Sequence, residues 1–223
     1  MDTPLSTVPA KGSGSATQRH VAALTRASLI DVAEELFSQQ GYAAASLDAI
    51  VAGAEVTKGA LYHHFSSKQA LFEAVFERVE RAAAVEGNEA MHGITEPWDM
   101  AQAGLRAILG VMQRPLYLRI VMQDGPAVLG PERFRQAEER STLGIVAGII
   151  NAVLDVGTWD LEGEMVDTFS RIFYGAMSAA GISIASSDEP EAAAARAEAA
   201  VAFILLGLRE LAEQDAPNTW SNT

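Results

Sequence analysis

The chain has 223 residues, a formal net charge of −13 and no cysteine. The lack of cysteine excludes disulfides and thiolate metal sites, and no apolar run approaches the roughly 20 residues that a membrane-spanning helix needs. Apolar residues make up 49% of the chain, enough for a sizeable core, and the first twenty residues lack the apolar centre of a signal peptide. We therefore expect a soluble, cytoplasmic protein with no membrane partner.

The first part of the chain differs in composition from the rest. Residues 1–22 are rich in Thr, Ser, Gly, Pro and Ala without any period, which predicts a disordered arm. A first helix is expected to begin near Thr25, a plausible N-cap, and to end at Gly41, which suits a positive φ. Its apolar stripe at helical spacing is Leu29, Ile30, Ala33, Leu36 and Phe37.

Two short helices are predicted next, separated by a turn at residues 53–56. Ser46 is the N-cap candidate of the first and Thr57 that of the second, which spans only about two turns. Ser66 and Gln69 have the spacing of a capping box, which predicts a connecting helix over about 67–84.

The remaining pattern is helical, with no strand alternation. Pro97 suits the first turn of a helix that runs to Met112. The further predicted elements are a helix over 115–122, a loop over 124–131, helices over 132–156, 161–185 and 191–214, and a frayed tail over 215–223. The fold prediction is all-α: a three-helix helix-turn-helix domain over residues 23–70, then a larger helical domain over residues 71–214 for ligand binding and dimerisation.

In a helix-turn-helix the second helix enters the major groove of DNA. Leu61 and Phe65 share the inner face of the helix that Thr57 caps, and Tyr62 and His63 lie on the other side. Gly59 has no side chain, so backbone and groove can approach closely. The net charge of residues 1–70, with five basic and six acidic side chains, is −1, so the acidic excess lies elsewhere, although this segment is no basic patch.

The segment from Leu24 to Phe76 resembles the tetracycline-repressor (TetR) family of bacterial transcription regulators. The matching residues are Ala33, Phe37, Gly41, Tyr42, Ser46, Ile50, Ala54, Val56, Thr57 to Tyr62, His64, Phe65 and Lys68. The resemblance implies a regulator that binds an operator in double-stranded DNA as a homodimer through its last two helices. Together with the helix pattern it gives these DNA-binding candidates: Ser46, Thr57, Lys58, Gly59, Ala60, Tyr62, His63, His64 and Lys68.

Two residues depart from the family pattern. Glu55 stands in the turn where relatives usually have glycine, so we expect a strained residue with positive φ. Val51 replaces a usual alanine, which is expected to shift the packing of the two short helices.

The C-terminal half carries small residues between 175 and 183 that would let helices of two subunits pack closely, although the same pattern also suits packing within one subunit. Its middle helices are expected to enclose a pocket for a neutral or weakly cationic organic effector, with no cofactor. The candidate pocket residues are Trp98, Met100, Leu105, Ile108, Met112, Tyr117, Val121, Met122, Phe134, Asn151, Phe173, Tyr174 and Met177.

The sequence therefore predicts a ligand-released repressor that binds a palindromic operator. The alternative is a helical ligand-binding or interaction protein that has lost DNA binding, which the acidic balance favours. An enzyme is not expected, because no nucleophile–base pair has usable spacing. Adjacent His63 and His64 do not have the spacing of a metal pair, and Glu138 and Glu139 are interpreted as a solvated face.

Overall fold

The computed structural model describes residues 13–156 and 163–213, and every regular element within these ranges is a helix. The chain divides into two compact units, residues 1–72 and residues 73–223. The predicted all-α architecture is confirmed. None of the helices in the described part of the chain is long and apolar enough to cross a membrane.

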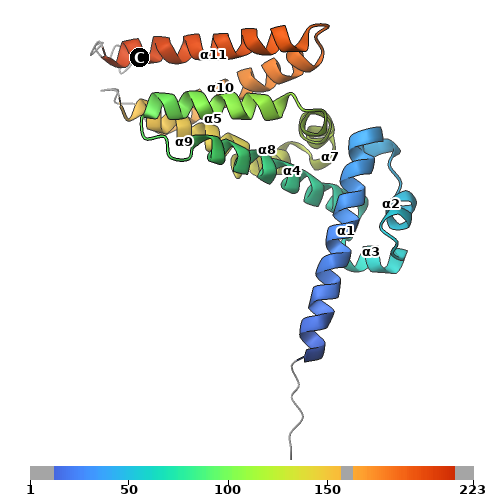
Figure 1. The fold of residues 1–223 in the computed structure, drawn as a ribbon. Helices are drawn as coiled ribbons and strands as arrows, with labels where there is room; N and C mark the ends of the chain where they lie inside the picture. The colour runs from blue at the N-terminus through green and yellow to red at the C-terminus, as the bar shows by residue number, and fades with distance from the viewer. Residues whose placement is uncertain (1–12, 157–162, 214–223) are drawn as a thin grey trace, which may run out of the picture. The chain divides into compact units, whose positions relative to one another are not determined.

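The first unit is built from α1 (Ser13–Ala44), α2 (Leu47–Gly53) and α3 (Lys58–His64), with the start of α4 (Lys68–Met91). The two short helices pack against the second half of α1 (Figure 1). Its fully buried side chains come from all four helices: Leu29, Phe37, Ile50, Leu61, Leu71 and Phe72. The ring of Tyr42 closes this core, with its centroid 5.7 Å from that of Phe37 and 5.2 Å from that of Phe72.

Helix α1 begins at Ser13, so the predictions of a helix start near Thr25 and of a disordered arm through residue 22 were wrong for residues 13–22. Residues 1–12 lie outside the described part of the chain. No side chain between residues 18 and 28 is buried, so the apolar periodicity gives no sign of this stretch. Its alanine, leucine and arginine residues favour a helix through intrinsic propensity alone.

Two turns in the first unit have positive φ. Gly41 has a φ of 79° inside α1, where the helix is interrupted. Glu55, between α2 and α3, has a φ of 55° and is the one non-glycine residue with positive φ in the described chain. The sequence-based expectation for this turn is confirmed, and a side chain in this region costs roughly 1–2 kcal/mol.

Replacing Glu55 with glycine should therefore raise the free energy of unfolding, by about 1 kcal/mol. The gain should appear as a higher midpoint in urea with an unchanged m-value. Gly41→Ala is the matched control, because it places a Cβ on a residue with positive φ. It should lower the free energy of unfolding. A loss of stability in Glu55→Gly would show that the Glu55 side chain contributes a contact that outweighs the strain.

Helix α4 differs from its prediction at both ends. Ser67, not Ser66, caps it, because the Ser67 hydroxyl accepts a hydrogen bond from the Ala70 amide at 3.1 Å. At the other end α4 continues to Met91 instead of stopping near residue 84. Gly87 weakens the helical pattern there, but it is buried, and a Cβ on it would lie 3.4 Å from Ile108, so the missing side chain lets α4 pack closely.

The second unit contains the rest of α4 and all later helices. These are α5 (Pro97–Met112), α6 (Pro115–Tyr117), the π-helical turn η1 (Leu118–Asp124), α7 (Gly125–Leu129), α8 (Pro131–Glu139), α9 (Thr142–Leu154), α10 (Gly163–Ala185) and α11 (Pro190–Glu213). The predicted bounds of α5 are confirmed, and those of α10 and α11 agree to within two residues. The predicted frayed tail, residues 215–223, lies outside the described residues.

Two predictions for the middle of this unit were wrong. The segment 124–131 is not a loop, because Gly125–Leu129 is helical and Pro126 occupies a first-turn position that tolerates proline. The segment 132–156 is not one helix, because it breaks at Ser141, with a φ of −134° and a ψ of −107°. The break is stabilised by hydrogen bonds from Ser141 and Thr142 to Glu80, which the local pattern does not reveal.

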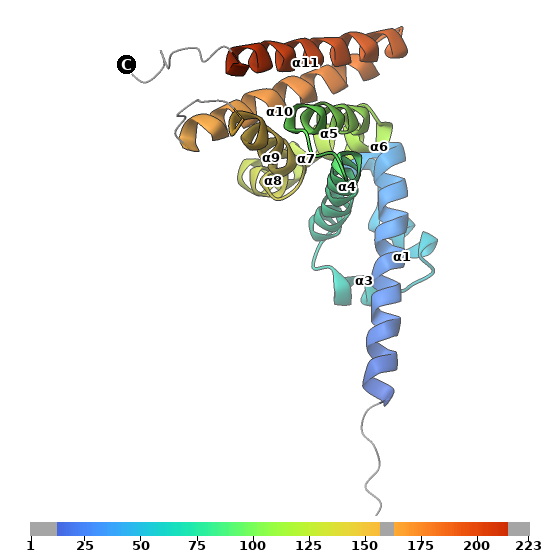
Figure 2. The same cartoon turned by 60° about the vertical axis from the view of Figure 1, so that its left-hand side comes forward.

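Helices α5, α9, α10 and α11 pack together in the second unit, and α10 and α11 lie side by side in both ribbon views (Figure 2). Gly181 on α10 is buried against α5, where an added Cβ would lie 3.0 Å from the Met112 Cβ and 3.1 Å from its carbonyl oxygen. The sides of α10 and α11 that face away from the other described helices are exposed. They carry large apolar side chains, including Ile172 (67% exposed) and Phe203 (78% exposed).

Candidate DNA-binding interface and interior polar cluster

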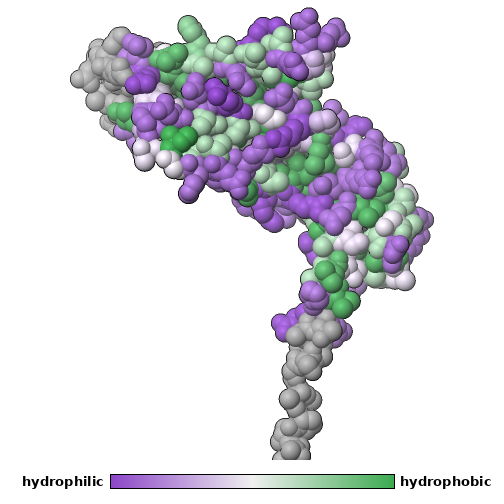
Figure 3. Space-filling model, viewed as in Figure 1, coloured by the Kyte–Doolittle hydropathy of each residue, from purple (hydrophilic) through white to green (hydrophobic). Residues whose placement is uncertain are grey.

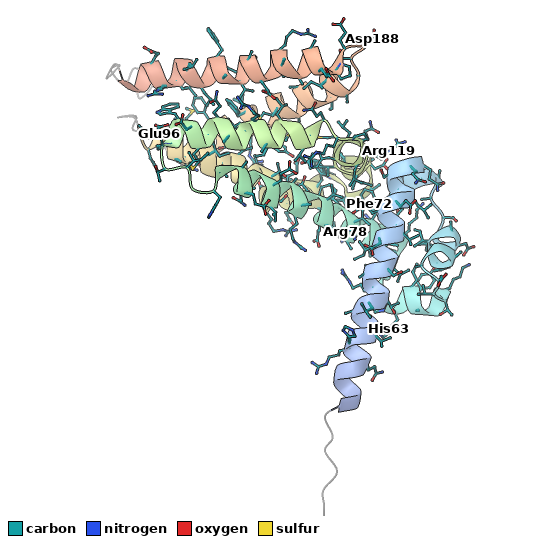
Figure 4. All side chains as sticks on the ribbon, viewed as in Figure 1. His63, Phe72, Arg78, Glu96, Arg119 and Asp188 are labelled. Atoms are coloured by element: carbon teal, nitrogen blue, oxygen red, sulfur yellow. The ribbon has the colours of Figure 1, made fainter. Side chains whose placement is uncertain are left out.

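Helix α3 presents one face to solvent because its other face anchors it. Leu61 is fully buried and Phe65, just beyond its last turn, is 4% exposed. Tyr62 is 55% exposed and His63 is exposed beside it. Figure 4 labels His63 on α3. Helix α3 itself packs against α1. The face that the sequence assigned to DNA is thus free to meet a partner.

Both short helices start at the side chains that the sequence predicted as caps. The Ser46 hydroxyl accepts a hydrogen bond from the Ala49 amide at 3.0 Å. The Thr57 hydroxyl accepts one from the Ala60 amide at 3.2 Å. Each cap satisfies one amide of the first turn and leaves others directed outward, in the arrangement that binds phosphate at helix N-termini.

The two lysines of the candidate interface are both engaged within the first unit. Lys58 forms an ion pair with Asp48 on α2, with 2.6 Å between Nζ and Oδ1, and this hydrogen bond raises the pKa of the lysine. The Lys68 ammonium lies 4.4 Å from the centroid of the Tyr42 ring and donates to the Ala43 carbonyl at 3.4 Å. Because both pairs are exposed or partly exposed, they are weak enough to be exchanged for phosphate.

Gly59 and His64 occupy different surroundings on α3. Gly59 is exposed, and an added Cβ would meet only the Thr57 hydroxyl, at 3.8 Å. Packing within the protein therefore does not require glycine here, which leaves room for a close approach from outside. His64 is only partly exposed, and burial lowers its pKa, which favours the neutral ring with a single N–H donor.

The second unit holds a buried polar cluster around Glu80, which is 2% exposed. Its carboxylate accepts hydrogen bonds from the Tyr117 hydroxyl at 2.5 Å, from the Thr142 hydroxyl at 3.0 Å, from the Thr142 amide at 3.3 Å and from the Ser141 hydroxyl. The cluster joins α4, α6 and the start of α9. Burial and the neighbouring Glu80 raise the pKa of Tyr117 well above its ordinary value, so its hydroxyl stays a donor.

Tyr174 on α10 completes this cluster. This residue is 7% exposed, and its buried hydroxyl lies near Tyr117 and Glu138 without a hydrogen bond of ordinary geometry to either. A cavity of about 260 Å³ between α4 and α8 opens onto Glu80 and Ser141. Its remaining lining residues are Phe76, Glu77, Arg81, Ala84, Ala137 and Arg140.

The structure distributes the predicted pocket residues over four environments. Tyr117 and Tyr174 lie in the polar cluster. Phe173 and Met177 line an apolar groove of about 330 Å³ between α9, α10 and α11. The other interior candidates, fully or largely buried, are Trp98, Met100, Leu105, Ile108, Met112, Val121, Met122 and Phe134. Asn151 is exposed, and its amide donates to the Ala147 carbonyl of its own helix at 2.8 Å, so its assignment to an interior pocket was wrong.

Sequence reasoning missed Glu80, although α4 carries a signal for it. Glu80 follows Phe72 by eight residues and Phe76 by four, so it lies on the apolar stripe of α4 and must be buried with them. A carboxylate in such a position needs partners. The interpretation of Glu138 as solvated was also wrong, because the structure leaves this residue only partly exposed. This burial raises the pKa of its carboxyl to about 7, and nearby Glu80 adds to the rise.

The raised pKa of Glu138 makes the free energy of unfolding depend on pH. Between about pH 4.5 and pH 7 the folded chain holds a proton on Glu138 that the unfolded chain has lost, so its contribution to stability falls as the pH rises. Glu138→Gln should remove this loss and raise the free energy of unfolding at pH 8 by on the order of 1 kcal/mol, after allowance for solvent contact. The gain should appear as a higher melting temperature at this pH. The two proteins should melt alike at pH 5, and equal shifts at both pH values would contradict the assignment.

The capped pair of short helices with an outward-facing second helix, joined to a larger helical unit, is the architecture of a helix-turn-helix DNA-binding protein. The model of bacterial regulatory proteins of the tetR family matches residues 29–75, and the tetracyclin repressor-like C-terminal domain matches residues 98–208. The chain belongs to the TetR family.

Individual relatives agree with this assignment. The HTH-type transcriptional regulator UidR of Escherichia coli K12 is 37% identical over 70 residues, which are 31% of this chain and 36% of UidR. AcrR of Shigella flexneri is 48% identical over 56 residues, 25% of this chain and 26% of AcrR. The matches therefore span only about a third or less of these curated relatives.

Solved structures extend the similarity to most of the chain. A TetR-family regulator from Pectobacterium atrosepticum has a TM-score of 0.67 and 30% identity, covering 85% of this chain and 96% of the other. RolR in complex with resorcinol has a TM-score of 0.63 at 19% identity, covering 90% and 98%. The latter identity is low enough that it supports the fold alone.

Proposed function

We propose that the protein is a ligand-released repressor that binds a palindromic DNA operator as a homodimer. The observation that carries the proposal is the exposed face of α3. Tyr62 and His63 face outward there, Gly59 leaves space, and buried Leu61 and Phe65 hold the helix in place. Thr57, Lys58 and Ala60 at the start of α3, with Ser46 and Lys68 beside it, complete the expected DNA contacts.

The proposed dimer uses the uncovered sides of α10 and α11. Most of the exposed large apolar side chains described for the second unit lie on these two helices, and an exposed apolar surface of this extent marks an interaction site. They are Met165, Phe169, Ile172, Ile182, Phe203, Ile204 and Leu206. Two-fold pairing of this surface would present two copies of α3 to two half-sites about 34 Å apart.

The proposed effector site is the cavity that opens onto the Glu80 cluster. Its size is close to the lower limit for a small-molecule pocket. The carboxylate of Glu80 accepts hydrogen bonds, so it suits a neutral or weakly cationic organic ligand with a hydroxyl or amine donor. Glu80 lies on α4, and the same helix begins in the first unit. A ligand that prefers one position of α4 would therefore change the population of the DNA-binding state.

Selection of bound duplexes from a random pool tests the DNA and dimer components together. We expect enrichment of an inverted repeat, and light scattering should give a mass twice that of the chain. Enrichment of no sequence at low salt would contradict the proposed function and favour a helical interaction protein that has lost DNA binding. A single, non-repeated half-site would contradict the homodimer.

A further inference from the structure

The first half of α1 is a cationic helix in an acidic protein. Residues 13–30 contain Arg19, His20 and Arg26 but no aspartate or glutamate, whereas the whole chain carries a net charge of −13. No side chain between residues 18 and 28 is buried, so the fold of the first unit does not need this stretch as core. Val21 and Leu24 are 56% and 57% exposed. We call residues 18–28 the α1 extension.

The two arginines of the α1 extension lie on the same side of α1 as its buried residues. Positions 19, 26, 30 and 37 share one helix face, because α-helices have about 3.6 residues per turn. Ile30 and Phe37 are buried on this face and pack towards the short helices. The α1 extension thus continues the inward face of the unit with arginine in place of core residues.

Arg26 fixes the position of this arginine face relative to α3. Its guanidinium lies 5.1 Å from the centroid of the Phe65 ring, directly after the end of α3. In Figures 1 and 2, α1 passes beside α3 and continues beyond it. Figure 3 shows this part of α1 as a surface of mixed hydrophobic and hydrophilic side chains. Arg19 is seven residues further along, about 10 Å at 1.5 Å per residue.

We propose that the α1 extension is a second DNA-contacting element, in which Arg19 and Arg26 bind phosphates beside the groove that α3 enters. This inference rests on the proposed function. A major groove is about 12 Å wide, so a strand bordering the groove lies within the reach of a side chain about 10 Å beyond α3. The positive charge of the arginine face favours DNA over an apolar partner. This face lies towards α3, whereas the apolar Val21 and Leu24 lie on the opposite face of the helix.

The test compares substitutions on the two faces of the α1 extension in the full-length protein, with the operator that the wild-type protein selects. Arg19→Ala should weaken operator binding about five- to tenfold. It should also reduce the slope of log affinity against log salt by about 2, because each phosphate contact contributes about 0.9 and two subunits each lose one. Hydroxyl-radical footprints should lose protection outside each half-site.

A matched pair of charge substitutions separates a local contact from general repulsion. Ala23→Glu and Val21→Glu each add one negative charge in the same turn at an exposed position, but on the arginine face and on the opposite face respectively. Ala23→Glu should weaken binding at least about fivefold more than Val21→Glu, because screening limits repulsion to about 10 Å. The exposed positions should leave the melting temperature unchanged in all three variants.

The possible results distinguish the inference from the function on which it rests. If the wild-type protein selects no DNA, the proposed function fails. If the wild-type protein binds its operator, but Arg19→Ala keeps its affinity, salt slope and footprint and the two glutamates act equally, then only the role of the α1 extension is overturned. Self-association that Val21→Glu abolishes, with unchanged DNA affinity in Arg19→Ala, would assign the segment to a protein contact instead.

Discussion

Replacing Glu80 with alanine is expected to lower the free energy of unfolding by about 3 kcal/mol or more. Four donors converge on this carboxylate, and the substitution leaves the Thr142 hydroxyl and amide buried without this acceptor. The Tyr117 hydroxyl would keep only its long hydrogen bond to the Thr142 hydroxyl, at 3.5 Å. Each unsatisfied buried donor costs about 1–3 kcal/mol. Urea unfolding followed by circular dichroism measures the change, provided that the transition remains cooperative.

A double-mutant cycle separates the hydrogen-bond network from the effect of a cavity. Tyr117→Phe removes one donor and keeps the ring, so alone it should cost only about 1 kcal/mol. Combined with Glu80→Ala it should cost less than the sum of the two single changes, with a coupling energy above about 1 kcal/mol. Additive effects would mean that Tyr117 and Glu80 do not interact in solution, and a cost below about 1 kcal/mol for Glu80→Ala would show that the site is wet.

The same variants bear on the effector site. Glu80→Gln preserves the size of the side chain and one acceptor oxygen, so it should fold more stably than Glu80→Ala. If the cavity beside Glu80 binds the effector, Glu80→Gln should keep operator binding while losing release by small phenols or amines that act on the wild-type complex. Release that is unchanged in Glu80→Gln would place the effector elsewhere in the second unit.

The features that the sequence predicts well in this protein are set by residues close together in the chain. The caps at Ser46 and Thr57, the positive φ at Glu55 and the bounds of α5 each depend on a few neighbouring residues. The DNA-binding candidates share this property, since all lie within residues 46–68 and are placed by the short helices α2 and α3 and by the first residue of α4. Whether they contact DNA remains a prediction, but their exposure and support follow from the pattern.

The parts that sequence analysis misses depend on contacts between distant residues or on their absence. Tyr117 and Thr142 are 37 and 62 residues from Glu80, and the break at Ser141 exists because the chain there turns its donors towards that carboxylate. No local period encodes such a convergence. The prediction for the first half of α1 was wrong for the opposite reason, since an exposed helix without a buried apolar stripe gives no periodic signal in the sequence.

Tyr62→Ala is expected to weaken operator binding at least about thirtyfold. Tyr62 is 55% exposed on α3, and a contact to a base or phosphate there would be worth about 1 kcal/mol or more per half-site. Two half-sites double the loss, and every 1.4 kcal/mol is about tenfold in affinity. Fluorescence anisotropy with the selected operator measures the effect at one fixed salt concentration.

The exposure of Tyr62 makes this change specific, because removing a solvent-facing ring leaves the packing of Leu61 and Phe65 intact. The melting temperature should stay within about 1 °C of the wild type, in line with the small effects of surface substitutions. Gln39→Ala, on the solvent side of α1 with a hydrogen bond only to Glu35 of its own helix, is the matched control and should bind the operator as the wild type does. Equal affinities for Tyr62→Ala and Gln39→Ala would mean that α3 presents another face to the groove, and the assignment of Gly59 and His63 to the same interface would fall with it.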